Sequence, residues 1–401
     1  MPDLSALDER LREGIGTIRS ADLLVGMPSF RNAATIGHVA ATVARGLREH
    51  FPDAKVALVN ADGGSEDGTP ERVAEAAAGI PVAVGRYIGP PGKGSALRAI
   101  FQCAVALDAR ACAVVDSDLR SITPSWIARL LGPIVSAQAD YVAPLYARHK
   151  HDGTITNSIA YPLTRALYGH RIRQPIGGEF GFHCDLARAY LAQPVWESDV
   201  ARFGIDIFMT TTALARHARI VQAFLGAKVH DPKDPAADLG PMFTQVVGTL
   251  FRLAAENEAV WRGVTRSRGV PVVGELAPVA PEAIPADPAR LRATYESIAP
   301  EQRDLWKDVL TAPLPKTMGP DEWARVVFDF LEEALRHPGR CEALARGLLP
   351  LYYLRVAEFV DEVRELDAER SEDVVELGAR AMEKEKLDRL EAVDESVGEA
   401  R

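Results

Sequence analysis

The chain has 401 residues, of which 47% are hydrophobic and 25% charged, a balance typical of an ordinary globular protein rather than a disordered or fibrous one. This length accommodates two or three domains, or one large α/β domain with an appendage. The formal net charge of −10 excludes a broad electrostatic attraction to nucleic acid or to an anionic membrane. A ligand that carries a phosphate would therefore have to bind to positive charges gathered locally at its site.

The cysteines and the N-terminal residues exclude two further classes of protein. Cys103, Cys112, Cys184 and Cys341 show no C-x-x-C spacing, so we expect neither a zinc site nor a disulfide framework. Residues 1–20 are charged and amphipathic without an apolar run, which predicts neither a secretory signal nor a membrane span there. We therefore expect a cytoplasmic protein.

Short apolar runs alternate with helical patterns between residues 22 and 115. The predicted elements are strands at 22–30, 55–61, 82–86 and 111–115 and helices at 34–50, 70–78 and 94–107. Because long helical crossovers join these strands, the pattern predicts an α/β fold in which helices sandwich a mainly parallel sheet.

The pattern changes near residue 265. Residues 271–288 hold five prolines and are typical of a linker, whereas 320–336 and 340–366 are amphipathic and helical. Residues 371–401 are heavily charged, and the last part of this segment is expected to fray or to form a solvent-exposed helix. The predicted organisation is an N-terminal helix at 1–21, a catalytic domain at 22–265, a linker at 266–290 and a helical region at 291–401.

Polar loops follow the four predicted strands at the same edge of the sheet. In chain order they are Pro28-Ser29-Phe30-Arg31-Asn32, Asp62-Gly63-Gly64-Ser65, Gly92-Lys93-Gly94 and Asp116-Ser117-Asp118. Ligands of such sheets bind outside the carboxyl ends of the strands, so the four loops together predict a binding site.

Asp116 and Asp118 end the fourth strand, which is apolar enough to be buried on both faces. Side chains two residues apart in an extended strand point to the same side, so this pair suits a hard divalent ion that carries a diphosphate. The alternative is a loop whose aspartates cap the helix that begins near Pro124.

Lys93 stands between two glycines whose backbone N–H groups can approach a phosphate at the start of a helix. The motif is not a P-loop, because Tyr87 and Gly94 occupy positions where that motif needs a glycine and a Ser or Thr. Asp62 can accept hydrogen bonds from a nucleobase or ribose, whereas residues 65–69 are typical of a turn and helix cap.

Glu179 and Asp206 each lie beside glycines, as expected where carboxylates bind sugar hydroxyls and the main chain approaches closely. Helix caps or surface turns remain alternative interpretations for either residue. His230 ends another short apolar run, and a neutral imidazole there would complete a metal site begun by Asp118.

In this order, the motifs resemble those of family-2-like glycosyltransferases with the GT-A fold. More narrowly, residues 20–250 resemble the glucosyl-3-phosphoglycerate, glucosylglycerate and mannosylglycerate synthases. The resemblance implies a nucleotide-sugar site comprising Pro28, Ser29, Phe30, Asn32, Asp62, Gly92, Lys93, Asp116 and Ser117.

The resemblance also implies a role for each part of the site. Lys93 binds the diphosphate, and Asp118 with His230 holds Mg²⁺ or Mn²⁺. Glu179 and Asp206 are the expected catalytic residues, bound to the donor hexose or near its reacting carbon, and the anomeric configuration is retained. The expected acceptor loop contains Gly153, Thr154, Thr156 and Asn157.

Two departures from the family pattern bear on the substrates. Arg31 and Asn32 stand where the family often has Asn and Glu, which leaves the base open. Thr154 stands where the phosphoglycerate enzymes carry an arginine, which favours D-glycerate or a similar small hydroxy acid and the compatible solute glucosylglycerate as product. Arg148, His149 or Lys150 could instead compensate and bind a phosphorylated acceptor.

The motifs leave two other functions open. A sugar-phosphate nucleotidyltransferase also uses a glycine-rich turn, a lysine and acidic metal ligands, although its usual G-x-G-T-R opening is missing from the first loop. The non-enzymatic alternative is an oligomerisation scaffold built by the C-terminal helices. The expected partners are the nucleotide sugar, a small acceptor and a second copy in a homodimer, with no nucleic acid and no integral membrane segment.

Overall fold

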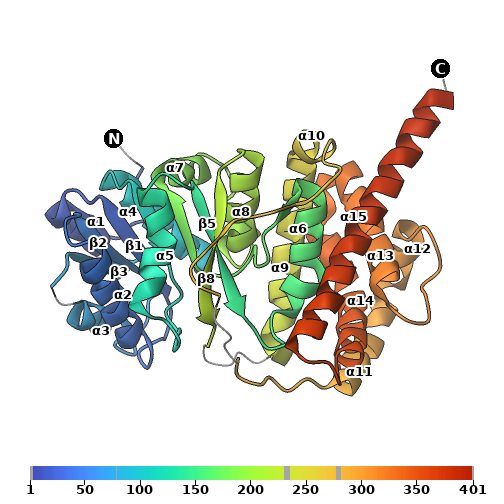
Figure 1. The fold of residues 1–401 in the computed structure, drawn as a ribbon, viewed down its shortest axis with the longest axis horizontal. Coiled ribbons are helices and arrows are strands. Elements are labelled where there is room, and N and C mark those ends of the chain that lie inside the picture. Colours follow the sequence, from blue (N-terminus) through green and yellow to red (C-terminus); the bar gives the residue numbers. More distant parts are fainter. Residues whose placement is uncertain (1–2, 78, 230–234, 277–280, 400–401) are drawn as a thin grey trace. The chain divides into compact units, whose positions relative to one another are not determined.

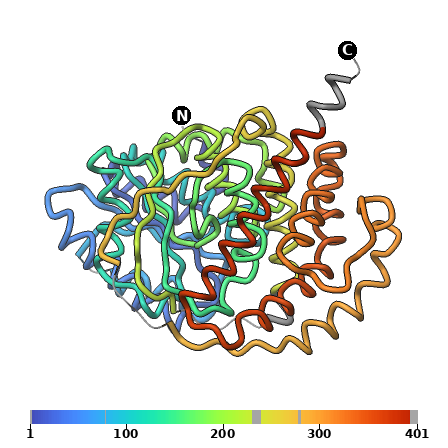
Figure 2. The backbone as a smooth tube through the Cα atoms, turned by 45° about the vertical axis from the view of Figure 1, so that its right-hand side comes forward, coloured from blue at the N-terminus to red at the C-terminus, as the bar shows by residue number. Residues whose placement is uncertain are grey.

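The computed structural model describes residues 3–77, 79–229, 235–276 and 281–399, which form two compact units (Figure 1). The first unit comprises Met1–Ala147, Ile176–Lys233 and Val270–Pro281, and the second comprises Arg148–Pro175, Asp234–Gly269 and Glu282–Arg401. Each unit therefore consists of three stretches of the chain, whose course can be followed by colour in Figure 2. This division differs from the predicted continuous domains, because residues 148–175 and 234–269 pack among the C-terminal helices.

The first unit is built on a mixed sheet with the strand order β10-β8-β5-β7-β4-β1-β2-β3 among the described residues. Its strands are β1 (Leu23–Ser29), β2 (Val56–Asp62), β3 (Val82–Arg86), β4 (Ala111–Val114), β5 (Tyr141–Ala147), β7 (Phe180–His183), β8 (Ile220–Ala227) and β10 (Val272–Val273). All neighbours run parallel except β7, which is antiparallel to both β4 and β5. The prediction of a mainly parallel α/β sheet is confirmed.

Helices cover both faces of this sheet. They are α1 (Glu9–Ile18), α2 (Ile36–His50), α3 (Thr69–Ala76), α4 (Lys93–Ala106), α5 (Pro124–Val135), α7 (Cys184–Leu191), α8 (Ile205–Ala215) and the 3₁₀ turn η2 (Asp199–Ala201). Each strand or helix predicted between residues 22 and 115 lies within two residues of an observed one. The observed α4 begins one residue before the predicted helix, so Lys93 is its first residue.

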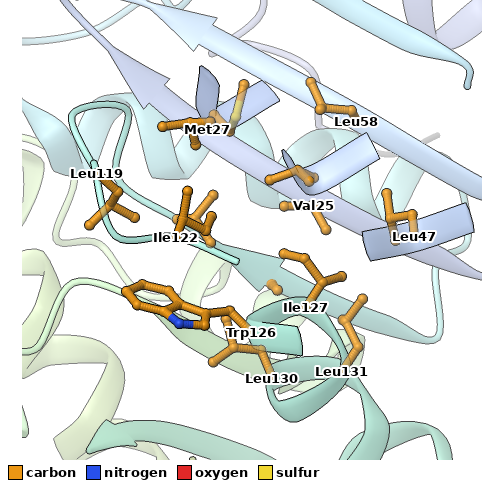
Figure 3. Packing of buried hydrophobic residues seen from close by; sticks show 14 of the residues in the cluster. Val25, Met27, Leu47, Leu58, Leu119, Ile122, Trp126, Ile127, Leu130 and Leu131 are labelled. Atoms are coloured by element: carbon orange, nitrogen blue, oxygen red, sulfur yellow. The ribbon is translucent and has the colours of Figure 1, made fainter. Parts of the chain in front are cut away.

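The alternation of β1 explains how the two faces pack. Val25 and Met27 face α2 and α5 in a core that includes Trp126 (Figure 3), where burial of each large apolar side chain contributes roughly 1.5–3 kcal/mol. Gly26 faces the other side, and a Cβ atom there would lie 2.3 Å from Cγ2 of Ile100. The glycine thus lets α4 lie directly on the sheet, with its N-terminus at the carboxyl edge.

The second unit is helical. Its elements are η1 (Thr156–Ala160), α6 (Tyr161–Tyr168), α9 (Pro235–Glu256), α10 (Glu258–Trp261), α11 (Pro288–Ile298), η3 (Ala299–Gln302), α12 (Arg303–Val309), α13 (Pro320–Arg336), η4 (Pro338–Arg340), α14 (Cys341–Glu362), α15 (Ala368–Glu399) and the paired strands β6 (His170–Arg171) and β9 (Arg268–Gly269). The two helices predicted at 320–336 and 340–366 are confirmed as α13 and α14.

The first half of α15, although rich in charged residues, packs on α6 and α13 (Figure 2). Arg165 of α6 is 2% exposed and forms ion pairs with Glu376 at 2.6 Å and Glu383 at 2.9 Å. Lys386 is equally buried and donates to three backbone carbonyl oxygens at 2.6 to 3.1 Å. The charges of α15 therefore pair inside the unit.

Two further findings concern the cysteines and the apolar character of the helices. The four cysteines are buried and form no disulfide. None of the helices in the described ranges has the length and apolarity needed to cross a bilayer.

Candidate active site

Charged side chains from five segments meet at the carboxyl edge of the first unit's sheet. They are Lys93 at the start of α4, Asp116 after β4, Glu179 before β7, Asp206 in the first turn of α8 and Lys228 after β8. Because β7 runs antiparallel, its first residue lies at the same edge as the last residues of β4 and β5. This cluster unites four residues predicted from sequence with Lys228, which was not predicted.

Asp116 lies at the centre of the cluster. Nζ of Lys93 is 2.8 Å from its Oδ1, and Nζ of Lys228 is 3.2 Å from its Oδ2. Lys93 also lies 3.2 Å from Oδ1 of Asp206. Two lysines on separate elements therefore hold the Asp116 carboxylate, one at each oxygen.

Glu179 is completely buried, and both of its oxygens accept hydrogen bonds from Lys228, at 3.0 and 2.9 Å. The hydroxyl of Tyr146 donates to Oε2 of the same carboxylate. Burial raises the pKa of Glu179 to about 7, although the charge of Lys228 opposes this shift. Burial likewise raises the pKa of Asp206.

The carboxylates in turn stabilise the charge of Lys93. Burial by itself would lower the pKa of this lysine, but the neighbouring carboxylates, first Asp116 and then Asp206, raise it overall. Lys93 is therefore a permanent cation at the N-terminus of α4.

Gly178 permits the close packing of this cluster. Its φ of +98° lies in the region that favours glycine, and a Cβ atom there would lie 2.5 Å from Oδ2 of Asp116 and 2.9 Å from Nζ of Lys228. The sequence predicted that glycines here allow a close backbone approach to a sugar. In the structure, the groups that approach Gly178 are a carboxylate and an ammonium.

Asp62 is buried and organises the turn that follows β2. Its Oδ1 accepts from the backbone N–H groups of Gly64 at 2.8 Å and Ser65 at 2.6 Å. Its Oδ2 accepts from the hydroxyls of Ser29 at 2.6 Å and Ser65 at 2.9 Å. Four protein donors thus occupy the carboxylate that the sequence assigned to base and ribose.

The first and fourth loops are joined through Asn32, whose Oδ1 accepts from the hydroxyl of Ser117 at 2.8 Å and from the backbone N–H of Phe30 at 3.1 Å. Pro28 lies inside β1 and is buried. The ring of Phe30 is 54% exposed, and the guanidinium of Arg31 lies 5.0 Å from its centroid. Phe30 is the exposed apolar surface of this loop.

The glycines around Lys93 use their backbone N–H groups within the protein. Gly92 donates to the hydroxyl of Tyr87 at 3.0 Å, and Gly94 donates to the carbonyl of Arg202 at 3.1 Å. These two contacts fix the start of α4, and the approach of the two N–H groups to a phosphate stays a prediction. The Lys93 side chain is the charged group that this turn presents.

Asp118 does not share the surroundings of Asp116. β4 ends at Val114, and the next residues lead into a turn formed by Ser117 and Asp118. Asp116 and Asp118 therefore do not lie in an extended strand, and the prediction that their side chains point to the same side does not hold. The half-buried carboxylate of Asp118 has no hydrogen bond or ion pair with any residue in the described ranges.

The loop after Asp118 is joined to the segment that precedes His230. Arg120 donates its backbone N–H to the carbonyl of Val229 at 2.8 Å, and the N–H of Val229 donates to the hydroxyl of Ser121 at 2.9 Å. His230 itself lies outside the described residues, and the described part of the chain contains no ready cluster of three metal-binding side chains. The unpaired carboxylate of Asp118 fits an oxygen-preferring divalent ion.

The predicted acceptor residues lie in the second unit, where the chain enters η1. They are Gly153, Thr154, Thr156 and Asn157. Gly153 adopts a φ of +64°, and the hydroxyl of Thr154 lies 2.6 Å from that of Tyr352. Asn157 accepts from Arg173 at 2.8 Å. The side chains of Thr154 and Asn157 are thus already held by contacts within the unit.

Sequence reasoning missed Lys228 and Tyr146. Both stand at or after the carboxyl ends of strands, and Lys228 directly follows the apolar run of β8. Lys93 was selected because it follows a predicted strand at the carboxyl edge of the sheet. Lys228 would have been selected in the same way if β8 had been predicted as a further strand of that sheet.

The comparisons with known proteins agree with the motifs. No family model matches the chain. A curated glucosyl-3-phosphoglycerate synthase of Mycolicibacterium smegmatis is 28% identical over 244 residues, which are 57% of this chain and 76% of that protein. One of Persephonella marina is 28% identical over 193 residues, 44% of this chain and about half, 48%, of that protein.

A solved structure is also similar. It is glucosyl-3-phosphoglycerate synthase from Mycobacterium tuberculosis in complex with Mn²⁺, UDP-glucose and phosphoglyceric acid, 26% identical, with 60% of this chain and 83% of that chain covered and a TM-score of 0.48. The similarity to the curated proteins confirms the resemblance predicted from the motifs, and with it the prediction of an enzyme. The chain is thus similar to the glucosyl-3-phosphoglycerate synthases and resembles glycosyltransferases of the GT-A fold.

Proposed function

We propose that the chain is a metal-dependent, retaining glycosyltransferase that moves a hexose, most simply glucose, from a nucleotide sugar to D-glycerate or a similar small hydroxy acid. The observation that carries this proposal is the position of Lys93 between the carboxylates of Asp116 and Asp206 at the edge of the sheet. One cation for a diphosphate and carboxylates for sugar hydroxyls lie there within a single buried cluster.

Each group has a distinct part in the proposed reaction. Lys93 attracts the donor diphosphate to the N-terminus of α4, and Asp206 stabilises positive charge at the reacting sugar carbon. Asp118 and His230 would hold a divalent ion, which when bound neutralises charge on the departing nucleoside diphosphate. The cluster offers no single unpaired nucleophile, which favours attack of the acceptor hydroxyl from the face that the diphosphate leaves.

The surroundings of Thr154 support an acceptor without a phosphate. The Thr154 hydroxyl contacts Tyr352, and the two cations nearest in sequence already have partners. Arg148 lies 3.1 Å from Asp152, and Lys150 donates to three backbone carbonyl oxygens that follow α14. A phosphorylated acceptor would have to displace one of these contacts.

A phosphorylated acceptor is the second candidate. It is favoured by the names of the two curated relatives, both glucosyl-3-phosphoglycerate synthases. The two candidates share the donor site and differ only at the acceptor.

The test is a matrix of UDP-, GDP- and ADP-hexoses against D-glycerate and 3-phosphoglycerate, with Mn²⁺, Mg²⁺ or EDTA. Product mass and release of nucleoside diphosphate are measured, and the larger kcat/KM identifies the acceptor. Chelation or Asp118→Asn is expected to reduce transfer by about 100-fold or more. Asp388→Asn, the same change on an exposed residue of α15, is the control. Absence of transfer with every pair, or transfer unaffected by EDTA, would refute the proposal.

A further inference from the structure

We propose that Lys228 is a positioning residue that fixes the carboxylates of Glu179 and Asp116 and does not itself contact the substrate. This inference rests on the proposed function of the same site. The two lysines of the cluster would then have different roles. Lys93 binds the nucleotide-sugar donor, and Lys228 holds the carboxylates in place.

The hydrogen bonds of Lys228 leave it no donor for a ligand. An ammonium group has three N–H bonds. The acceptors around Lys228 Nζ are the carbonyl of Gly177 at 2.9 Å, Oδ2 of Asp116 at 3.2 Å and the two oxygens of Glu179 at 2.9 and 3.0 Å. Three protein groups within 3.2 Å therefore engage the three N–H bonds of Lys228. Lys93 also has three protein acceptors, but the third, the carbonyl of Gly178, lies at 3.5 Å, the longest of these contacts.

The exposure of the two lysines supports the same division of roles. The side chain of Lys228 is 6% exposed and that of Lys93 is 17% exposed. Lys93 opens the first turn of α4, whereas Lys228 lies over the ring of Tyr146, with Nζ 5.5 Å from the ring centroid. Lys93 is the more accessible cation for an incoming diphosphate.

The charge balance shows why the carboxylates need Lys228. When all three carboxyl groups are ionised, the three carboxylates and two ammonium groups give the cluster a formal charge of −1. Without Lys228 the charge would be −2, and the fully buried Glu179 would lose the cation that contacts both of its oxygens. A buried carboxyl group that loses its counter-ion and these hydrogen bonds is no longer fixed in place, whether it takes up a proton or moves, and Lys93 would then be the ammonium group left beside Asp116 and Asp206.

The surrounding backbone fits the ammonium closely. Gly178 presents only hydrogen at the point where a Cβ atom would lie 2.9 Å from Nζ, and the hydroxyl of Tyr146 donates to Oε2 of Glu179, which Lys228 also contacts. The surrounding residues therefore hold the ammonium group of Lys228 in one position, as a positioning role requires.

The test compares Lys228→Met and Lys228→Arg with the wild type, for both turnover and nucleoside diphosphate binding. Because the carboxylates are displaced, Lys228→Met is expected to lower kcat by about 100-fold. Its Kd for the nucleoside diphosphate is expected to stay within about fivefold of the wild type, since no contact with the ligand is lost. Lys228→Arg, which keeps the charge, is expected to recover at least about tenfold in kcat.

Lys386→Met is the matched control, because Lys386 is also a buried lysine with three acceptors but lies in the second unit. It is expected to lower stability and leave kcat per folded molecule unchanged. The inference is overturned by a kcat of Lys228→Met close to the wild-type value, by a Kd that weakens while kcat holds, or by equal losses in the Met and Arg variants.

A crystal structure of Lys228→Met provides a readout that needs no turnover. The carboxylate of Glu179 is expected to leave its position beside Tyr146, and unchanged positions of Glu179 and Asp116 would overturn the inference. Wild-type transfer tests the proposed function separately, so failure of one is distinguishable from failure of the other.

Discussion

The position that a Cβ atom would take at Gly178 lies 2.5 Å from Oδ2 of Asp116. No real Cβ atom approaches an oxygen so closely, so any side chain at this position must push the carboxylate out of its place between the two lysines. The glycine is therefore required by the packing of the charged cluster as well as by its own φ of +98°.

Gly178→Ala is expected to lower kcat by about 100-fold, because Asp116 is displaced from Lys93 and Lys228. Gly68→Ala is the control, since Gly68 has a similar φ of +86° but no atom within 4 Å of its Cβ position. Both variants should lose roughly 1–2 kcal/mol of stability from the left-handed backbone. Steady-state kinetics and denaturant unfolding make the comparison, and equal kcat values in the two variants would contradict the assigned role.

Glu179 should make the stability of the first unit depend on pH. Lys228, Asp116, Lys93 and Tyr146 surround this carboxyl group, and burial raises its pKa from 4.5 to about 7. A pKa raised in the folded state gives stability that is complete below pH 4.5 and is lost as the pH rises through 7.

The free energy of unfolding of the wild type should therefore fall relative to that of Glu179→Gln between pH 4.5 and 7. The full change is at most about 3 kcal/mol, from the size of the pKa shift. Urea unfolding of both proteins at several pH values measures it. A difference between them that stays constant over this range would show that Glu179 titrates normally.

Asp62 is expected to act on stability rather than on the ligand. Asp62→Asn replaces one acceptor oxygen by an NH₂ group that faces protein donors, which should cost about 1–3 kcal/mol. Glu66→Gln, the equivalent change on an exposed neighbour, should have almost no effect. Unchanged stability together with lost nucleotide binding in Asp62→Asn would instead favour the role that the family resemblance implies.

The sequence predicted the first half of the sheet well because each strand there is a short apolar run separated by an amphipathic helix. It did not predict β7, whose four residues include a glycine and whose direction is opposite to that of its neighbours. Only the pairing of β7 between β4 and β5 brings Glu179 to the edge that carries Asp116. Long-range pairing of this kind leaves no local signal.

Site residues could be predicted from their position in a loop that follows a strand. The sequence did not show which of these residues already form all their hydrogen bonds within the protein. Lys93 and Asp206 were selected from residue type and position, and the structure places them together. Asp62 met the same criteria, yet its carboxylate is fully hydrogen-bonded by its own turn and by Ser29. Residue type alone does not distinguish a carboxylate that binds a ligand from one that organises a turn.

The packing of α15 could not be predicted either, because residue type does not show whether a charged side chain is paired within the protein. A run rich in Glu, Lys and Arg usually forms a solvated helix, but here Glu376 and Glu383 both pair with Arg165 of α6. Arg165→Met keeps the volume of the side chain and leaves the two carboxylates without their shared cation. Because they are about one-quarter exposed, the expected cost is about 2–3 kcal/mol, below the 3–5 kcal/mol of a fully buried pair.

Arg380→Met is the control for this change, since Arg380 is an exposed arginine on α15 itself and should alter stability by less than about 0.5 kcal/mol. Denaturant unfolding gives the free energies, and hydrogen exchange of α15 amides locates the effect. Faster exchange along α15 in Arg165→Met, with the amides of β1 unchanged, would show that the ion pairs hold this helix to the second unit. Equal stability of the two variants would mean that apolar packing alone holds it.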